Sequence, residues 1–172
     1  MAHGKVGDLK VVEAVRRDIP QVRTFILDAW MIAGSSAWGW TGASEENVQG
    51  LASSEHLTQL ISNPKVRILL AREDGRIVGL AATRESDAHT LELAGIIVDE
   101  RHTGKGVGTA LAKKALGIAA DSRYKEVLVK TETFNKRALA FYGSMGFVQT
   151  GVTTEDVDGK SITLSVLKRK LS

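Results

Sequence analysis

The segment RHTGKGVGTAL, residues 101–111, places three glycines directly before a helix-forming run of Ala, Leu and Lys. The first amides of a helix have no partner within it and carry partial positive charge, so they attract anions. A glycine-rich turn adds further amides and lets a ligand approach the backbone closely. The pattern predicts a cradle for a phosphate or pyrophosphate. The residues expected to form it are Thr103, Gly104, Lys105, Gly106, Val107, Gly108 and Thr109.

Other glycine motifs fit this segment less well. It lacks the Gly-Lys-Ser/Thr ending of a P-loop. A dinucleotide-binding turn of an NAD-type oxidoreductase is a closer rival, because Glu132 stands where a ribose-binding acid belongs. However, the spacing is G-x-G-x-G rather than G-x-G-x-x-G, and residues 99–103 separate the strand from the first glycine. A structural turn without a ligand is the remaining interpretation.

Glu92 is a second candidate for chemistry, because it is a charged residue within the largely apolar segment TLELAGIIVD, residues 90–99. A carboxylate in apolar surroundings can act as a general base. Glu132 ends the segment 126–132 and is the alternative base. For each of them, a solvent-facing strand position is the competing interpretation.

The elements that must position these residues alternate between strand and helix patterns. Asp74-Gly75 between two apolar runs predicts a hairpin. Residues 35–50 show no period and are expected to form a loop. The order β-α-α-β-β-β-α-β-α-β-β indicates an α/β fold with a mixed sheet and a single domain over residues 1–172. The strands are expected at 9–15, 65–73, 76–86, 90–99, 126–132 and on both sides of Asp158-Gly159, and the helices at 17–34, 53–63, 109–122 and 135–147.

Composition narrows the function classes. The net charge is +3 without a long basic run, so we expect no nucleic-acid partner. The chain has no Cys, which excludes disulfides and a cysteinyl acyl-enzyme, and its histidines have no metal-site spacing, so no metal is expected. No apolar run reaches the roughly 18 residues of a membrane span, and the first residues lack a signal-peptide core. We therefore expect a cytoplasmic protein without a membrane partner.

The second half of the chain resembles the GNAT superfamily of N-acetyltransferases, which use acetyl-CoA. The family loop reads Arg/Gln-x-x-Gly-x-Gly/Ala, and two registers fit. The first, which we prefer, puts Thr103, Gly106 and Gly108 at the defining positions, with Thr103 departing from the long Arg or Gln; the second starts at Arg101. A further family segment, Asn-x-x-Ala-x-x-x-Tyr-x-x-x-Gly-Phe, is matched by Asn135, Ala138, Tyr142, Gly146 and Phe147.

The resemblance implies that strands 90–99 and 126–132 are parallel, central and splayed apart, with acetyl-CoA between them. In that arrangement the amide of Ile96 faces the thioester carbonyl and Val98 pairs with the pantetheine arm. Tyr142 then donates a proton to the departing thiolate, and Glu92, Glu132 or a water accepts the proton of the amine. The residues expected to contact the cofactor arm are Ile96, Ile97, Val98, Asn135 and Ala138.

The resemblance predicts an N-acetyltransferase that acts by direct attack of a primary amine within a ternary complex. Residues 28–50 are expected to form the acceptor pocket, with Trp30, Trp38 and Trp40 as candidate contacts. A small-molecule amine and a peptide amine both remain open, and strand 161–168 could pair across a homodimer. A CoA-binding sensor domain without turnover is the non-enzymatic alternative.

Overall fold

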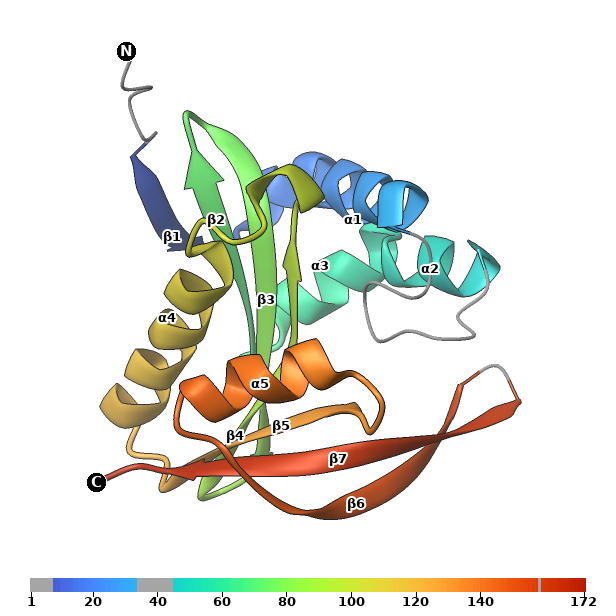
Figure 1. Cartoon of the computed structure of the whole chain (residues 1–172). Coiled ribbons are helices and arrows are strands. Elements are labelled where there is room, and N and C mark those ends of the chain that lie inside the picture. Colours follow the sequence, from blue (N-terminus) through green and yellow to red (C-terminus); the bar gives the residue numbers. More distant parts are fainter. Residues whose placement is uncertain (1–7, 34–44, 158) are drawn as a thin grey trace, which may run out of the picture.

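The computed structural model describes residues 8–33, 45–157 and 159–172, and its centre is a seven-stranded sheet in the order β1-β2-β3-β4-β5-β7-β6 (Figure 1). The strands are β1 Leu9–Glu13, β2 Val66–Glu73, β3 Arg76–Asp87, β4 Thr90–Val98, β5 Glu126–Glu132, β6 Val148–Val157 and β7 Lys160–Lys170. The helices are α1 Ile19–Ala33, α2 Glu45–Leu51, α3 Ser54–Ser62, α4 Val107–Asp121 and α5 Lys136–Ser144, with short 3-10 turns η1 Arg16–Asp18 and η3 Glu100–His102.

The strand pairing confirms a mixed sheet with parallel central strands. β4 and β5 pair in parallel, whereas each other neighbouring pair of strands is antiparallel. The parallel ladder joins Thr90–Leu93 to Glu126–Val129 and stops there within the described chain. At the same point the ladder with β3 skips Ala94, which is a β-bulge. Beyond the bulge β4 continues beside β3 while β5 continues beside β7, so the two central strands part.

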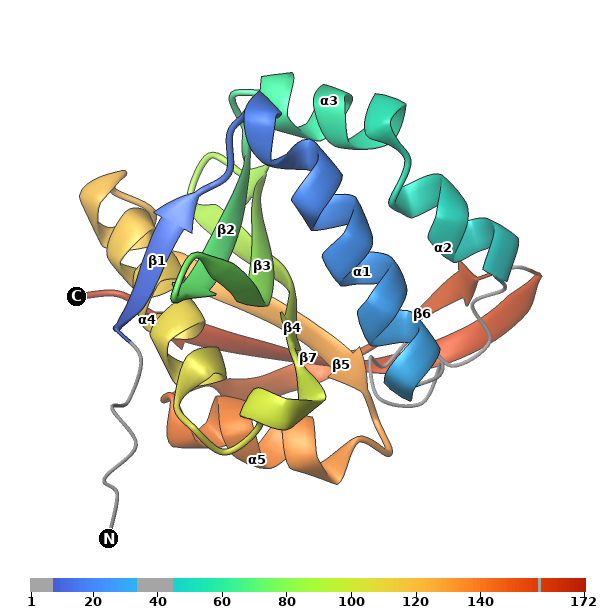
Figure 2. The same ribbon diagram turned by 90° about the horizontal axis from the view of Figure 1, so that it is seen from above.

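Two helical layers cover the sheet. Figure 2 shows α4 and α5 on one face and α1, α2 and α3 on the other. Leu91, Leu93, Val127 and Val129 point into the core beneath α4 and α5. On the opposite face, Leu70 and Leu80 belong to the core shared with α1 to α3. Successive strand residues point to opposite faces, so Glu92 lies on the side away from α4 and α5.

Local signals account for several boundaries. Asp74 and Gly75 have φ angles of 50° and 77°, as the predicted tight hairpin turn requires. Ser53 accepts a hydrogen bond from the amide of His56 at 3.1 Å and caps α3. Gly79 lets β3 approach α4, because a Cβ at this position would lie 2.6 Å from Cγ1 of Val107.

Two sequence-based boundaries were wrong. Residues 45–51 form α2, although residues 35–50 were expected to be a loop. Only Val48 of α2 is buried, so its apolar period is too weak to recognise. Helix α4 starts at Val107 rather than at residue 109, because Gly106 already serves as its N-cap. Across the described ranges, every helix falls short of the length and hydrophobicity that a bilayer span requires.

Candidate functional site

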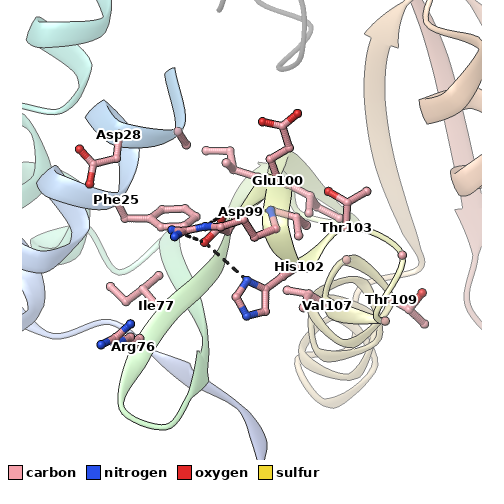
Figure 3. Close-up of a pocket in the computed structure, with 18 of the residues that line it drawn as sticks. Phe25, Asp28, Arg76, Ile77, Asp99, Glu100, His102, Thr103, Val107 and Thr109 are labelled. Atoms are coloured by element: carbon pink, nitrogen blue, oxygen red, sulfur yellow. Dashed lines mark hydrogen bonds and ion pairs between the residues drawn. The ribbon is translucent and has the colours of Figure 1, made fainter. Parts of the chain in front are cut away.

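A cleft of about 960 Å³ lies where β4 ends. Its walls come from the last residues of β4, from η3, from the N-terminal ends of α4 and α5, from α1 and from the β2–β3 turn. Figure 3 shows Phe25 and Asp28 of α1 on one side, and Val107 and Thr109 of α4 on the other. The cleft therefore opens at the place where β4 and β5 part.

The glycine turn forms one wall of this cleft. Gly104 and Gly106 have φ angles of 78° and 83°, a backbone region that residues with a Cβ rarely adopt. The first intrahelical hydrogen bond of α4 runs from Ala110 N–H to Gly106 O. The amides before it, at residues 107–109, have no partner within the helix. The turn residues that line the cleft are Thr103, Gly104, Gly106, Val107, Gly108 and Thr109.

Lys105 is the exception among the expected cradle residues. It is exposed and does not line the cleft. The side chain of Arg101, the other candidate for the family's Arg/Gln position, turns back to Asp99 and is 80% exposed. Arg101 lines the cleft, but its guanidinium is paired with Asp99, so the turn's unpaired donors are its backbone amides.

A small polar network fixes the turn in place. Asp99 accepts hydrogen bonds from the backbone amide of Arg101 at 3.1 Å and from its side chain. Burial raises the pKa of Asp99, but the hydrogen bonds from Arg101 outweigh it, so the net pKa is lowered and the carboxylate stays ionised. His102 Nε2 lies 2.8 Å from Glu73 Oε2, which ties η3 to the end of β2.

The edge of β4 that faces the gap carries unpaired backbone groups. Asp99 N–H donates to Val78 O on β3 at 2.9 Å. Antiparallel ladders alternate, so the amide of Ile97, opposite Leu80, also points to β3. The amides of Ile96 and Val98 therefore point the other way, toward the gap. All three residues of β4, Ile96, Ile97 and Val98, line the cleft as expected.

Helix α5 brings a further set of expected residues to the same cleft. Asn135 Oδ1 accepts a hydrogen bond from Ala138 N–H at 3.0 Å and caps the helix. Tyr142 packs edge-on against Phe141 and Phe147 and is 8% exposed. Burial raises the pKa of Tyr142 to about 12, so its hydroxyl keeps its proton at neutral pH. Asn135, Ala138 and Tyr142 all line the cleft.

The two candidate bases lie beside the gap rather than in the cleft. Glu92 is 6% exposed, and its Oε2 accepts a hydrogen bond from Arg84 Nε at 2.7 Å. Glu132, at the end of β5, is 1% exposed. Neither lines the cleft of about 960 Å³. Leu128, directly opposite Glu92, lies an even number of residues from Glu132, so both carboxylates lie on the face away from α4 and α5.

Of the three tryptophans expected at the acceptor site, Trp30 is the one that the structure describes. Trp30 is half-buried and packs against the core between α1 and the sheet. It does not line the cleft. Trp38 and Trp40 lie outside the described residues.

Sequence reasoning missed most of the cleft wall that belongs to α1, because only Asp28 and Ala29 of this wall fall within the expected acceptor segment 28–50. Polar residues at i, i+3 and i+7 share a helix face, a spacing that is equally typical of a solvated surface. Only the packing of α1 beside β4 identifies this face as part of a site. The α1 residues that line the cleft are Pro20, Gln21, Thr24, Phe25, Asp28 and Ala29.

Comparison with curated proteins finds N-acetyltransferases. The chain is 35% identical over 102 residues to an uncharacterised N-acetyltransferase of Mycobacterium tuberculosis H37Rv, covering 59% of this chain and 65% of that protein. It is 34% identical over 87 residues to human N-acetyltransferase 8, covering 48% of this chain and 38% of that protein. Human N-acetylaspartate synthetase is 35% identical over 97 residues, covering 56% and 32%. Each alignment thus spans less than two thirds of the relative.

Solved structures share the fold. The PaiA N-acetyltransferase of Thermoplasma acidophilum, solved in complex with coenzyme A, aligns with a TM-score of 0.72 and 20% identity over 95% of this chain and 99% of that one. A ribosomal-protein-alanine N-acetyltransferase of Brucella melitensis aligns with a TM-score of 0.76 and 20% identity over 94% and 99%. The family model for the acetyltransferase (GNAT) family matches residues 32–147. That match covers more than half of the chain, which therefore belongs to the acetyltransferase (GNAT) family.

Proposed function

We propose that this chain transfers an acetyl group from acetyl-CoA to a primary amine by direct attack within a ternary complex. The observation that carries the proposal is the parting of β4 and β5 after Leu93 and Val129, next to a cleft that ends on the glycine turn. Family membership and the names of the relatives support it.

The cleft fits coenzyme A. The amides of residues 107–109 and the turn before them would hold the pyrophosphate, because they combine unpaired donors with the positive end of α4. The gap-facing groups of Ile96 and Val98 would pair with the extended pantetheine arm as a neighbouring strand does. Asn135 and Ala138 would flank that arm from α5. When bound, the acetyl thioester supplies the reactive carbonyl.

The amide of Ile96 would stabilise the negative charge that develops on the thioester oxygen as the amine attacks. Its N–H is held in place by the β3–β4 ladder and needs no rearrangement during the reaction. A backbone donor of this kind typically contributes about 3–4 kcal/mol to transition-state stabilisation.

The attacking amine must lose its proton. An amine with a pKa of about 10.4 is neutral in only about one molecule in 2,500 at pH 7, a gap of about 4.6 kcal/mol. We assign the base to Glu92, acting through water, with Glu132 as the alternative base on the same face. In the reaction the amine nitrogen bonds to the carbonyl carbon, the carbon–sulfur bond breaks, and the amine's proton passes to the base.

Tyr142 would return a proton to the departing sulfur. Its raised pKa of about 12 keeps the hydroxyl protonated, and no described residue forms a hydrogen bond with it. Tyr142 lies in the last turn of α5 and lines the cleft, beside the expected path of the arm. A proton donor at this point prevents the thiolate from attacking the new amide in reverse.

The nucleotide-binding oxidoreductase has less support. Such folds are built from parallel βαβ units, whereas β2, β3 and β4 form antiparallel hairpins and β4–β5 is the one parallel pair in the described sheet. The CoA-binding sensor shares the fold and cleft of the proposed enzyme and differs from it in turnover alone.

The experiment combines binding with turnover. Calorimetry titrates the purified chain with acetyl-CoA and, in parallel, with NAD. Release of free CoA is then followed with a panel of primary amines. We expect acetyl-CoA to bind, NAD not to bind, and at least one amine to release CoA in equimolar amount with its acetylated product. Tight acetyl-CoA binding without turnover on any amine would favour the sensor instead.

A further inference from the structure

We propose that Arg84 binds the carboxylate of an amino-carboxylate acceptor, an amino acid or a short peptide, whose amine reaches the gap between β4 and β5. This inference rests on the proposed function, and it names the class of acceptor. It is based on the ion pair between Arg84 and Glu92 and on the position of that pair in the sheet.

The guanidinium of Arg84 is held in a fixed orientation by a buried partner. Its Nε donates to Glu92 Oε2 at 2.7 Å, and the side chain of Glu92 is 8% exposed whereas that of Arg84 is 55% exposed. The hydrogen bond with Glu92 raises the pKa of Arg84, so the cation is permanent. Arg84 is thus anchored through Nε to the buried carboxylate of Glu92, and the rest of its guanidinium faces solvent.

The outer part of that fork is available for a ligand. No described residue accepts a hydrogen bond from the two terminal nitrogens of Arg84. A guanidinium presents paired N–H groups that match the two oxygens of a carboxylate. Because Glu92 already fixes Nε, little side-chain freedom remains to be lost when a carboxylate binds.

The position of Arg84 places this anion site at the acceptor side of the gap. Arg84 lies opposite Glu92, the residue before Leu93, and the parallel ladder ends at Leu93. Coenzyme A, in the proposed function, occupies the side lined by α4 and α5. Glu92 and Arg84 lie on the opposite face, from which the amine must approach.

The distance along the sheet limits the shape of the acceptor. Ala81 of β3 lies opposite Ile96, whose amide would face the thioester oxygen. Arg84 lies three positions beyond Ala81, about 10 Å along an antiparallel strand, and the long Arg side chain spans part of this distance. An acceptor that reaches both points carries its amine and its carboxylate on one small molecule or on a short peptide.

Neighbouring charges favour a molecule with both signs. Lys130 on β5 pairs with Glu155 at 2.9 Å, and the charge of Glu155 also acts on Arg84. The face beside the gap thus combines two cations with the carboxylates of Glu92 and Glu155. An ammonium group and a carboxylate on the same acceptor complement this alternation.

The test uses acceptor pairs that differ in the carboxylate alone: L-alanine with L-alaninamide, 4-aminobutyrate with n-butylamine, and glycylglycine with glycylglycinamide. The full-length chain is assayed for CoA release with acetyl-CoA saturating, and kcat/KM is corrected for the neutral amine fraction. We expect at least one carboxylated member to exceed its partner about 10- to 100-fold, as a charge-assisted bidentate hydrogen bond predicts.

Arg84→Lys is the main variant, because it keeps the cation beside Glu92 but loses the fork. We expect it to remove most of the preference through KM, with little change in acetyl-CoA affinity. Arg84→Met removes the preference as well, but it leaves Glu92 buried without its partner and can unfold the chain. Arg67→Met is the control, because Arg67 lies on β2, opposite Thr83, and points to the other face.

Several results overturn the inference. Equal kcat/KM within every acceptor pair would do so, as would a preference that Arg84→Lys leaves intact. Turnover of n-butylamine without turnover of any carboxylated acceptor would overturn it while the proposed acetyltransferase function stands. Failure of acetyl-CoA to bind in calorimetry would instead overturn the proposed function, and this inference with it.

Discussion

Leu93 and Val129 form the last pair of the parallel ladder between β4 and β5. The next residue of β4, Ala94, is a bulge, and from Gly95 onward β4 is held by β3 on one side alone. The β3–β4 ladder therefore fixes the backbone of this segment, although the amides that face the gap form none of the ladder's hydrogen bonds. This arrangement gives each amide of the segment a separate, testable role.

Ile96→Pro deletes the amide proton proposed to stabilise the thioester oxygen. Because that N–H points away from β3, the substitution removes no hydrogen bond of the β3–β4 ladder. We expect a folded protein whose kcat falls about 10²- to 10³-fold. Thermal unfolding and CoA release measure both properties.

Ile97→Pro is the matched control, because the amide of Ile97 points to β3 and its loss should destabilise the sheet. Ile96→Ala keeps the amide and should keep most of the activity. If Ile96→Pro folds and retains the kcat of the unmodified chain, this amide is not the oxyanion donor.

Gly106→Ala tests the glycine turn. The φ angle of Gly106 is 83°, which costs a residue with a Cβ about 1–2 kcal/mol. We expect lower unfolding free energy and weaker acetyl-CoA binding, because strain moves the amides that follow. Gly117→Ala, in the middle of the same helix with open space at its Cβ, should instead stabilise the protein by about 0.5–1 kcal/mol. Calorimetry measures the acetyl-CoA affinity of each variant, and chemical unfolding measures its stability. Equal acetyl-CoA affinity in Gly106→Ala and Gly117→Ala would contradict the proposed cradle.

Glu92→Gln removes the proposed base but keeps an oxygen that can accept a hydrogen bond from Arg84. General-base catalysis typically contributes 10²- to 10⁴-fold, so we expect kcat to fall about 100-fold or more. Glu132→Gln is assayed in parallel, and a loss of activity confined to that variant would assign the base to Glu132.

Sequence alone was sufficient for the elements whose local signals agree with their packing. Three segments have a sequence pattern that is compatible with a single local structure: the Asp74-Gly75 turn, the apolar end of β4 and the glycine turn. Helix α2 was missed because burial of Val48 alone leaves no periodic stripe. Tertiary contacts decide such weak segments.

The parts of the site that consist of backbone groups could be predicted from the sequence. The parts that depend on contacts between side chains of different elements could not. Arg84 and Glu92 are eight residues apart in the chain, and their ion pair exists because the β3–β4 hairpin and its bulge set them opposite each other. No sequence pattern encodes that register. The part of the cleft wall formed by Thr24 and Phe25 of α1 likewise follows from helix placement against β4.

Tyr142→Phe tests the proposed proton donor. The substitution keeps the ring packing against Phe141 and Phe147 and removes the hydroxyl. We expect kcat to fall about 100-fold, the lower end for general-acid catalysis, because a thiolate is already a fair leaving group. The control is Tyr124→Phe, because this second tyrosine hydrogen-bonds Glu85 and does not line the cleft. Unchanged CoA release in Tyr142→Phe would exclude the role.

The raised pKa of Tyr142 also predicts a loss of stability in alkali. The pKa is about 12 in the folded chain and about 10 when unfolded, so below pH 10 both states keep the proton. Between pH 10 and 12 the unfolded state loses it first, and unfolding becomes more favourable. Two pKa units correspond to a total loss of about 2.7 kcal/mol, most of which is reached by pH 12.

This loss is measured by chemical unfolding from pH 8 to pH 11.5. Burial and the hydrogen bond to Glu85 also raise the pKa of Tyr124, so the comparison is made in a Tyr124→Phe background. There, the free energy of unfolding should fall more steeply above pH 10 when Tyr142 is present than in the Tyr124→Phe/Tyr142→Phe double variant. At pH 11 the difference should reach about 1.4 kcal/mol. Parallel pH dependence in the two proteins would mean that the hydroxyl of Tyr142 titrates like an exposed phenol and that burial does not keep it protonated.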